Sequence, residues 1–216
     1  MERTVPNTCN IEFEYVNDIP IAFCRPDKNK SNNSIAVWLP WLGGNKETGA
    51  KELQKLASYG YFAISVDPWL HGDRSGDLKE DLRALVFKEF RKYMWQILGI
   101  TTMDAFRVAD WAIDSFNLNE NIVAGGLSMG GDIAIALAGI DARVSKVAAI
   151  ASSPNWERPG MTDVMDSNKV LSQGKSSNFG NWLFRTLNPM SNLNSFRRPL
   201  KLHVELGELD THINPQ

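Results

Sequence analysis

The chain has 216 residues, of which 43% are hydrophobic and 22% charged, and its formal net charge is −2. These values are ordinary for a soluble globular protein, and we expect a single domain over residues 1–216. Charges of both signs are mixed along the sequence, so no basic stripe indicates a nucleic-acid partner. No apolar run reaches the roughly 18 residues of a membrane span, and the N-terminus lacks the apolar core of a secretory signal. We therefore expect a cytoplasmic location and no membrane partner.

The N-terminal region has the pattern of a β-hairpin. Residues 11–16 and 19–23 alternate between apolar and polar side chains, and Asn17 and Asp18 lie between them. This arrangement predicts two antiparallel strands. Cys9 and Cys24 flank the hairpin and could pair across it. They do not have the spacing of metal ligands, and we expect them to be reduced residues packed in the core.

Two nearly continuous apolar runs follow, at residues 35–39 and 61–66. Runs of this kind are typical of strands that are covered on both faces. Residues 48–58 between them have the apolar spacing of a helix that ends at Gly60. A strand, a helix and a second strand in this order predict a parallel pair.

The middle of the chain is expected to be helical and the remainder mixed. Apolar residues recur at helical spacing over 77–98, and Gly99 is expected to end that helix. Thr101 and Asp104 resemble a capping box that opens a second helix over 103–116. Residues 144–151 and 200–206 read as further strands. Residues 154–190 between them predict a short irregular or helical excursion without a core of its own.

Residues 125–131 read Gly-Gly-Leu-Ser-Met-Gly-Gly, between an apolar run at 122–124 and an Ala/Ile-rich segment at 132–138. A strand, a sharp turn and a helix in this order would hold the Ser128 hydroxyl out over the end of a sheet. Gly126 and Gly130 would allow the chain to pass close to the turn. The structural alternative is a glycine-rich turn without chemistry.

The order of the motifs resembles the α/β-hydrolase fold over residues 34–216. A glycine-containing bend follows 35–39, Asp-x-x-x-His-Gly follows 61–66, Gly-x-Ser-x-Gly follows the third apolar run, and Gly-x-x-Asp follows 200–206. The chain looks similar to bacterial dienelactone-hydrolase-like and prolyl-oligopeptidase-like serine esterases. This resemblance implies a mostly parallel central sheet with helices on both faces and an N-terminal antiparallel hairpin.

The resemblance also implies an active site. Ser128 matches the nucleophile, Asp210 matches the acid that orients a histidine, and the backbone N–H groups of Met129 and Leu42 match the oxyanion donors. Such a site would cleave carboxylic esters or related small acyl compounds through an acyl-enzyme on Ser128. It needs neither a cofactor nor a metal ion.

The serine needs a histidine as its general base. His203 reads as a polar-face strand residue, His71 as a turn or pocket residue, and His212 as too close in sequence to Asp210 for that carboxylate to orient it. We expect the base to lie beyond Gln216, together with a further strand and a helix. Residues 200–206 would then form an exposed sheet edge beside uncovered apolar surface.

Other interpretations remain open. A protein with the same fold could bind a ligand in this pocket without catalysis. Trp41, His71 and Trp156 are candidates for the pocket wall. Phosphate binding at residues 43–46 is disfavoured, because the lysine is not followed by Ser or Thr and the glycines lack P-loop spacing. The scattered histidines and cysteines do not suggest a metal centre. The sequence does not indicate an oligomeric state.

Overall fold

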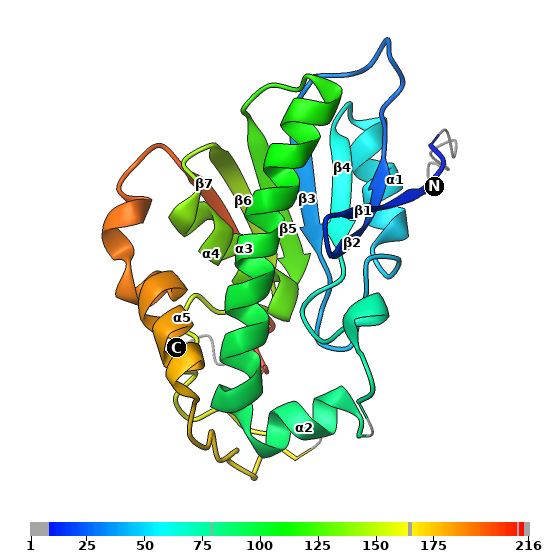
Figure 1. Ribbon diagram of the computed structural model, residues 1–216. Helices are drawn as coiled ribbons and strands as arrows, with labels where there is room; N and C mark the ends of the chain where they lie inside the picture. The colour runs from blue at the N-terminus through cyan, green and yellow to red at the C-terminus, as the bar shows by residue number, and fades with distance from the viewer. Residues whose placement is uncertain (1–8, 79, 164–165, 211, 214–216) are drawn as a thin grey trace.

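A computed structural model describes residues 9–78, 80–163, 166–210 and 212–213 (Figure 1). The chain begins with the expected hairpin, in which β1 (Glu12–Val16) pairs antiparallel with β2 (Ile19–Cys24). Asn17 at the turn has a φ of 56°, in the left-handed region that asparagine tolerates better than most residues. The alternating pattern therefore predicted this element correctly.

One seven-stranded sheet, in the order β1-β2-β4-β3-β5-β6-β7, organises the described part of the chain. Its remaining strands are β3 (Ile35–Leu39), β4 (Phe62–Val66), β5 (Ile122–Leu127), β6 (Val144–Ile150) and β7 (Lys201–Glu205). The strands β3 to β7 pair in parallel, and β2 joins β4 antiparallel. The predicted fold class is confirmed.

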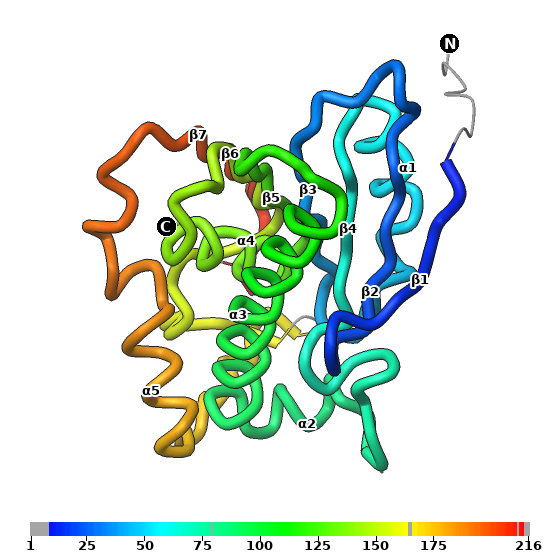
Figure 2. Tube along the Cα trace, turned by 45° about the horizontal axis from the view of Figure 1, so that its top comes forward, coloured from blue at the N-terminus to red at the C-terminus, as the bar shows by residue number. Residues whose placement is uncertain are grey.

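Helices pack on both faces of the sheet (Figures 1 and 2). The long α3 (Phe90–Phe116) and α4 (Met129–Ile140) enclose the main core on one face. On the other face, α1 (Ala50–Ser58) packs on β2 and β4 through a smaller cluster that includes Leu53 and Ala57. In the strand order, β1 and β7 lie at opposite edges of the sheet.

Shorter elements complete the fold. The α2 helix (Leu82–Lys88) precedes α3, and α5 (Asn178–Leu187) packs against α3. Three short 3₁₀ turns are η1 (Gly72–Arg74), η2 (Pro189–Ser191) and η3 (Leu193–Phe196). The segment expected as an excursion thus contains one regular helix, α5, and η2. No described helix is long and apolar enough to cross a membrane.

The prediction of a helix break at Gly99 is wrong, because α3 runs through this glycine. A Cβ at Gly99 would lie 2.8 Å from the Cβ of Leu183 on α5, so glycine allows the two helices to approach closely. Thr101 does not cap a helix either. Its hydroxyl oxygen accepts the N–H of Trp69 at 3.0 Å, which ties α3 to the loop after β4. The helical break occurs instead at Glu89, between α2 and α3.

The expectation of two reduced cysteines is also wrong in the structure, where Cys9 and Cys24 form a disulfide. Their Cα atoms are 6.0 Å apart, within the range that a disulfide bridges. The bond fastens the chain before β1 to the buried end of β2. The cytoplasmic location expected from the N-terminal sequence remains a prediction.

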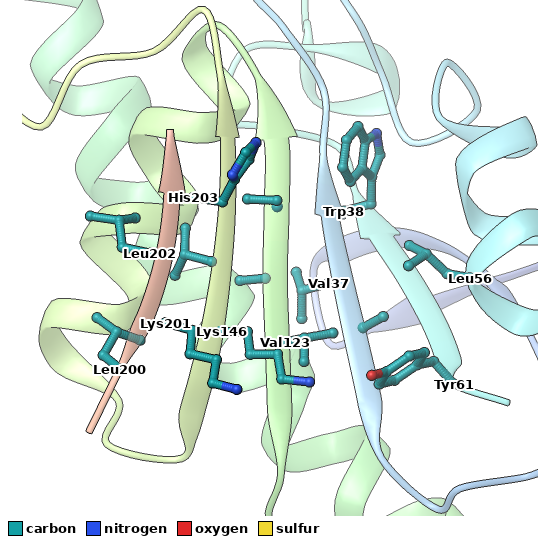
Figure 3. A pocket seen from close by; sticks show the side chains of 15 residues that line it. Val37, Trp38, Leu56, Tyr61, Val123, Lys146, Leu200, Lys201, Leu202 and His203 are labelled. Atoms are coloured by element: carbon teal, nitrogen blue, oxygen red, sulfur yellow. The ribbon is translucent and has the colours of Figure 1, made fainter. Parts of the chain in front are cut away.

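The last strand lies at the edge of the sheet, as expected. β7 pairs only with β6 among the described strands, and all five of its residues are exposed. A groove of about 660 Å³ lies beside β7, on the same face of the sheet as α1, where this helix does not cover the strands. Figure 3 shows Trp38, Tyr61 and Leu56 at one side of this groove and His203 of β7 at the other. The further strand and helix expected beyond Gln216 remain a prediction.

Candidate active site

Ser128 lies at the junction of β5 and α4, with φ 53° and ψ −121°. This strained backbone conformation turns the chain sharply between strand and helix. The turn is compact because two glycines leave room for it. A Cβ at Gly130 would lie 2.0 Å from the carbonyl oxygen of Leu39, and one at Gly126 would lie 2.4 Å from the carbonyl carbon of Gly130.

Hydrogen bonds from the end of β6 hold the serine backbone in place. The Ser128 N–H donates to the carbonyl of Ile150 at 2.8 Å. The Ser152 hydroxyl lies 2.9 Å from the Ser128 carbonyl and 2.8 Å from that of Ile150. Gly131 accommodates this hydroxyl, because a Cβ there would lie 1.9 Å from it. These hydrogen bonds therefore fix the backbone of the turn, while the Ser128 residue itself stays partly exposed.

The bend that carries Leu42 follows β3, next to the serine. Gly43 has a φ of 86°, and the Gly44 N–H donates to the Trp41 carbonyl at 2.8 Å. The bend begins where Leu39 pairs with Gly126, directly before the serine turn. The Leu42 and Met129 amides thus belong to adjoining segments.

A cavity of about 600 Å³ opens at this end of the sheet. Its lining is mainly apolar and includes four residues expected in the site together with Trp41 of the expected pocket wall. The lining residues are Trp41, Leu42, Arg83, Phe87, Met94, Leu127, Ser128, Met129, Ala151, Arg158, Asp210, His212 and Ile213. Ser128, Met129, Leu42 and Asp210, from three separate parts of the sequence, therefore share one cavity.

Asp210 is partly buried in the loop after β7. One of its carboxylate oxygens accepts the backbone N–H groups of His212 at 2.9 Å and Ile213 at 2.8 Å. These bonds shape the loop and hold the carboxylate at the cavity. No hydrogen bond joins Asp210 to a histidine ring within the described ranges.

His212 lines the same cavity, which its sequence distance from Asp210 did not suggest. Its Nδ1 lies 2.7 Å from the Thr162 carbonyl, so Nδ1 carries the proton and Nε2 is the basic nitrogen. The Phe87 ring packs edge-on against the imidazole at 5.6 Å. Burial lowers the pKa of His212 below its ordinary value of 6.5, and the nearby charge of Arg158 lowers it further. The imidazole is therefore neutral at neutral pH.

Sequence patterns did not indicate the ion pair of Asp132 with Arg158. Asp132, in the first turn of α4, is completely buried, and the Arg158 guanidinium pairs with its carboxylate. The other carboxylate oxygen accepts the Ser153 N–H at 2.7 Å. Burial raises the pKa of Asp132, while Arg158 opposes this shift. The pair ties the start of the excursion to the helix behind the serine. Only the long-range contact itself could have revealed it.

Two residues expected in the pocket wall do not line this cavity. His71 is buried in the loop after β4, where its Nδ1 lies 2.8 Å from the Trp69 carbonyl. Trp156 is fully buried, and its carbonyl accepts the indole N–H of Trp95 at 3.0 Å. Both side chains therefore belong to the packed interior. His203 is exposed on β7, as expected.

Among the described residues, no group of three or more His, Cys, Asp or Glu side chains could hold a metal ion.

Comparisons with known proteins agree with this architecture. No protein-family model matches the chain. A Bacillus subtilis (strain 168) protein named "Putative hydrolase YtaP" is 25% identical over 160 residues, which cover 66% of this chain and 51% of that protein. The chain thus spans about half the length of this curated relative.

Solved structures match over nearly the whole chain. A Klebsiella pneumoniae protein named "Putative Dienelactone Hydrolase" has a structure with a TM-score of 0.59 at 16% identity, covering 95% of this chain and 88% of that one. The Pyrococcus furiosus esterase Pf2001 has a TM-score of 0.58 at 16% identity, covering 96% and 74%. At this identity the likeness concerns the fold. Together with the strand order and the serine turn, it shows that the chain has the α/β-hydrolase fold.

Proposed function

We propose that this protein is a serine hydrolase of carboxylic esters or related small acyl compounds. The observation that carries the proposal is the cavity that a strained, partly exposed Ser128 shares with Met129, Leu42 and Asp210. The names of the relatives, which include a hydrolase and an esterase, support the same class of reaction.

In the proposed reaction, the Ser128 hydroxyl oxygen attacks the substrate carbonyl carbon, and a histidine takes the hydroxyl proton. The Met129 and Leu42 N–H groups stabilise the negative charge that develops on the carbonyl oxygen. The intermediate collapses to an acyl-serine as the leaving group departs with the proton from the histidine. Water then releases the acid and regenerates the serine.

The base in this proposal is a histidine encoded beyond Gln216, which Asp210 would orient. His212 is the other candidate, because its neutral imidazole shares the cavity with Ser128. Replacing His212 with Gln in the gene product that contains residues 1–216 separates the two. Full retention of activity assigns the base to the residues beyond, whereas loss by about 10⁴-fold or more assigns it to His212.

Hydrolysis of p-nitrophenyl butyrate by the same gene product tests the proposal. We expect turnover that Ser128→Ala abolishes and that Asp210→Asn lowers by about 10²- to 10⁴-fold. The competing function is ligand binding without catalysis. One observation favours it, because one carboxylate oxygen of Asp210 accepts backbone N–H groups of its own loop and, among the described residues, not a histidine ring. No turnover at all would favour that alternative, whereas turnover that is unchanged in Ser128→Ala would refute Ser128 as the nucleophile.

A further inference from the structure

A buried lysine follows directly after the bend that carries Leu42. The side chain of Lys46 is 6% exposed. Its Nζ lies 3.1 Å from Asp67 Oδ2 and 2.9 Å from Asp73 Oδ2. Removing an ammonium group from water is costly unless carboxylates compensate it, and here two do so. Burial opposes the charged form, but the hydrogen bonds that Lys46 donates to Asp73 and Asp67 prevail and raise the pKa of Lys46. These contacts therefore favour the charged form of the side chain.

The Asp67 carboxylate, directly after β4, accepts hydrogen bonds from the backbone of two neighbouring segments. It is fully buried and accepts the Lys46 N–H at 2.8 Å and the Asp73 N–H at 2.8 Å, besides the Lys46 ammonium. Gly72, with a φ of 52°, makes room for it, because a Cβ there would lie 2.3 Å from Asp67 Oδ2. One carboxylate thus holds Lys46 by both backbone and side chain.

The network continues to the first strand. The Tyr15 hydroxyl of β1 donates to Asp73 Oδ2 at 3.1 Å. Lys46 therefore joins the bend after β3, the loop after β4 and the N-terminal hairpin.

The bend itself has few other hydrogen bonds. Within the described part of the chain, the hydrogen bond formed by residues 40–44 is internal, from Gly44 N–H to the Trp41 carbonyl. The Leu42 side chain packs against the main core, and Arg83 lies beside Gly43. The bend is held at one end where Leu39 pairs with Gly126, and at the other end by Lys46 on Asp67. Hydrogen bonds at these two ends thus hold the bend that carries the Leu42 N–H.

We propose that Lys46 is a positioning residue of the oxyanion hole, whose ammonium, held between Asp67 and Asp73, fixes the bend that presents the Leu42 N–H. This inference rests on the proposed hydrolase function. Losing one oxyanion donor costs about 10²- to 10³-fold in rate, so a loosened bend should cost about 10- to 100-fold. The loss should fall on kcat, since the donor binds charge that develops in the transition state.

Lys46→Met tests the proposal in the gene product that contains residues 1–216. We expect kcat for p-nitrophenyl butyrate to fall about 10- to 100-fold while KM changes less than about threefold. Asp73→Asn, at a half-exposed carboxylate, should give a smaller loss in the same direction. The control is Arg143→Met, which removes the partly buried ion pairs of Arg143 with Asp110 of α3 and with Asp141 in the loop before β6, and which should leave kcat unchanged.

Amide hydrogen exchange supplies a readout that does not need activity. In Lys46→Met, the hydrogen-bonded amides of Gly44 and of residue 46 should exchange at least about tenfold faster, while those of β5 and α4 keep their wild-type rates. Wild-type exchange at these two amides would overturn the inference, as would a kcat within about twofold of wild type in both Lys46→Met and Asp73→Asn. An inactive wild-type protein would instead refute the proposed hydrolase, and the exchange rates would still decide whether Lys46 fixes the bend.

Discussion

Close backbone packing at Gly130 makes a side chain there costly. A Cβ would lie 2.0 Å from the Leu39 carbonyl oxygen, which is backbone and cannot move aside cheaply. We expect Gly130→Ala to lower the free energy of unfolding by about 2–4 kcal/mol, measured by urea denaturation. The control is Gly139→Ala in the same helix, where the Cβ would meet only the Phe196 ring at 3.1 Å. Its effect should stay within about 1 kcal/mol. Equal effects of the two substitutions would contradict the close packing of the serine turn.

His71 predicts a pH dependence of stability. Its burial lowers the pKa of the folded imidazole below the ordinary value of 6.5. Above that value both the folded and the unfolded states are neutral, and His71 has no effect. As the pH falls below it, the unfolded chain binds a proton that the folded chain resists, so stability is lost. The loss continues until the pH passes the lower pKa of the folded state.

The variant His71→Asn isolates this contribution, because its amide can keep the bond to the Trp69 carbonyl and does not titrate. Between about pH 7 and about pH 5, the free energy of unfolding of wild type should fall more steeply than that of the variant. His212 contributes in the same direction to both proteins and cancels in the difference. Parallel curves would show that His71 is not buried as described.

At the scale of single elements, the disulfide gives a direct prediction for the N-terminal hairpin. Alkylation of the non-reduced, denatured protein should detect no free thiol, since Cys9 and Cys24 are paired. The double variant Cys9→Ser and Cys24→Ser should lose about 2–4 kcal/mol of stability, as expected for a closed loop of this length. Two free thiols in the non-reduced protein would contradict the pairing.

Local patterns predicted the elements whose burial is regular. Continuous apolar runs identified β3 and β4, and alternation identified the hairpin. The failure at Gly99 has a tertiary cause. Glycine usually weakens a helix by about 1 kcal/mol, but here it allows Leu183 to pack closely against α3. Neither the approach of α5 nor the partner of Thr101 could be read from nearby sequence.

Across the whole molecule, motif order predicted that Ser128 and Asp210 would lie at the same end of the sheet, because the carboxyl ends of parallel strands meet there. Motif order did not predict the polar contacts between distant segments. Lys46 meets Asp67 across 21 positions, and Arg158 meets Asp132 across 26. His71 and Trp156 were misplaced because a residue type says little about whether a side chain faces a cavity or the core.

The central claim is that Ser128 is a nucleophile in an accessible cavity. The most direct measurement is intact-mass and peptide analysis of the gene product containing residues 1–216 after treatment with a fluorophosphonate. We predict one adduct, on the peptide that contains Ser128, and none in Ser128→Ala. An unlabelled wild-type protein, or an adduct that persists in Ser128→Ala, would contradict the claim.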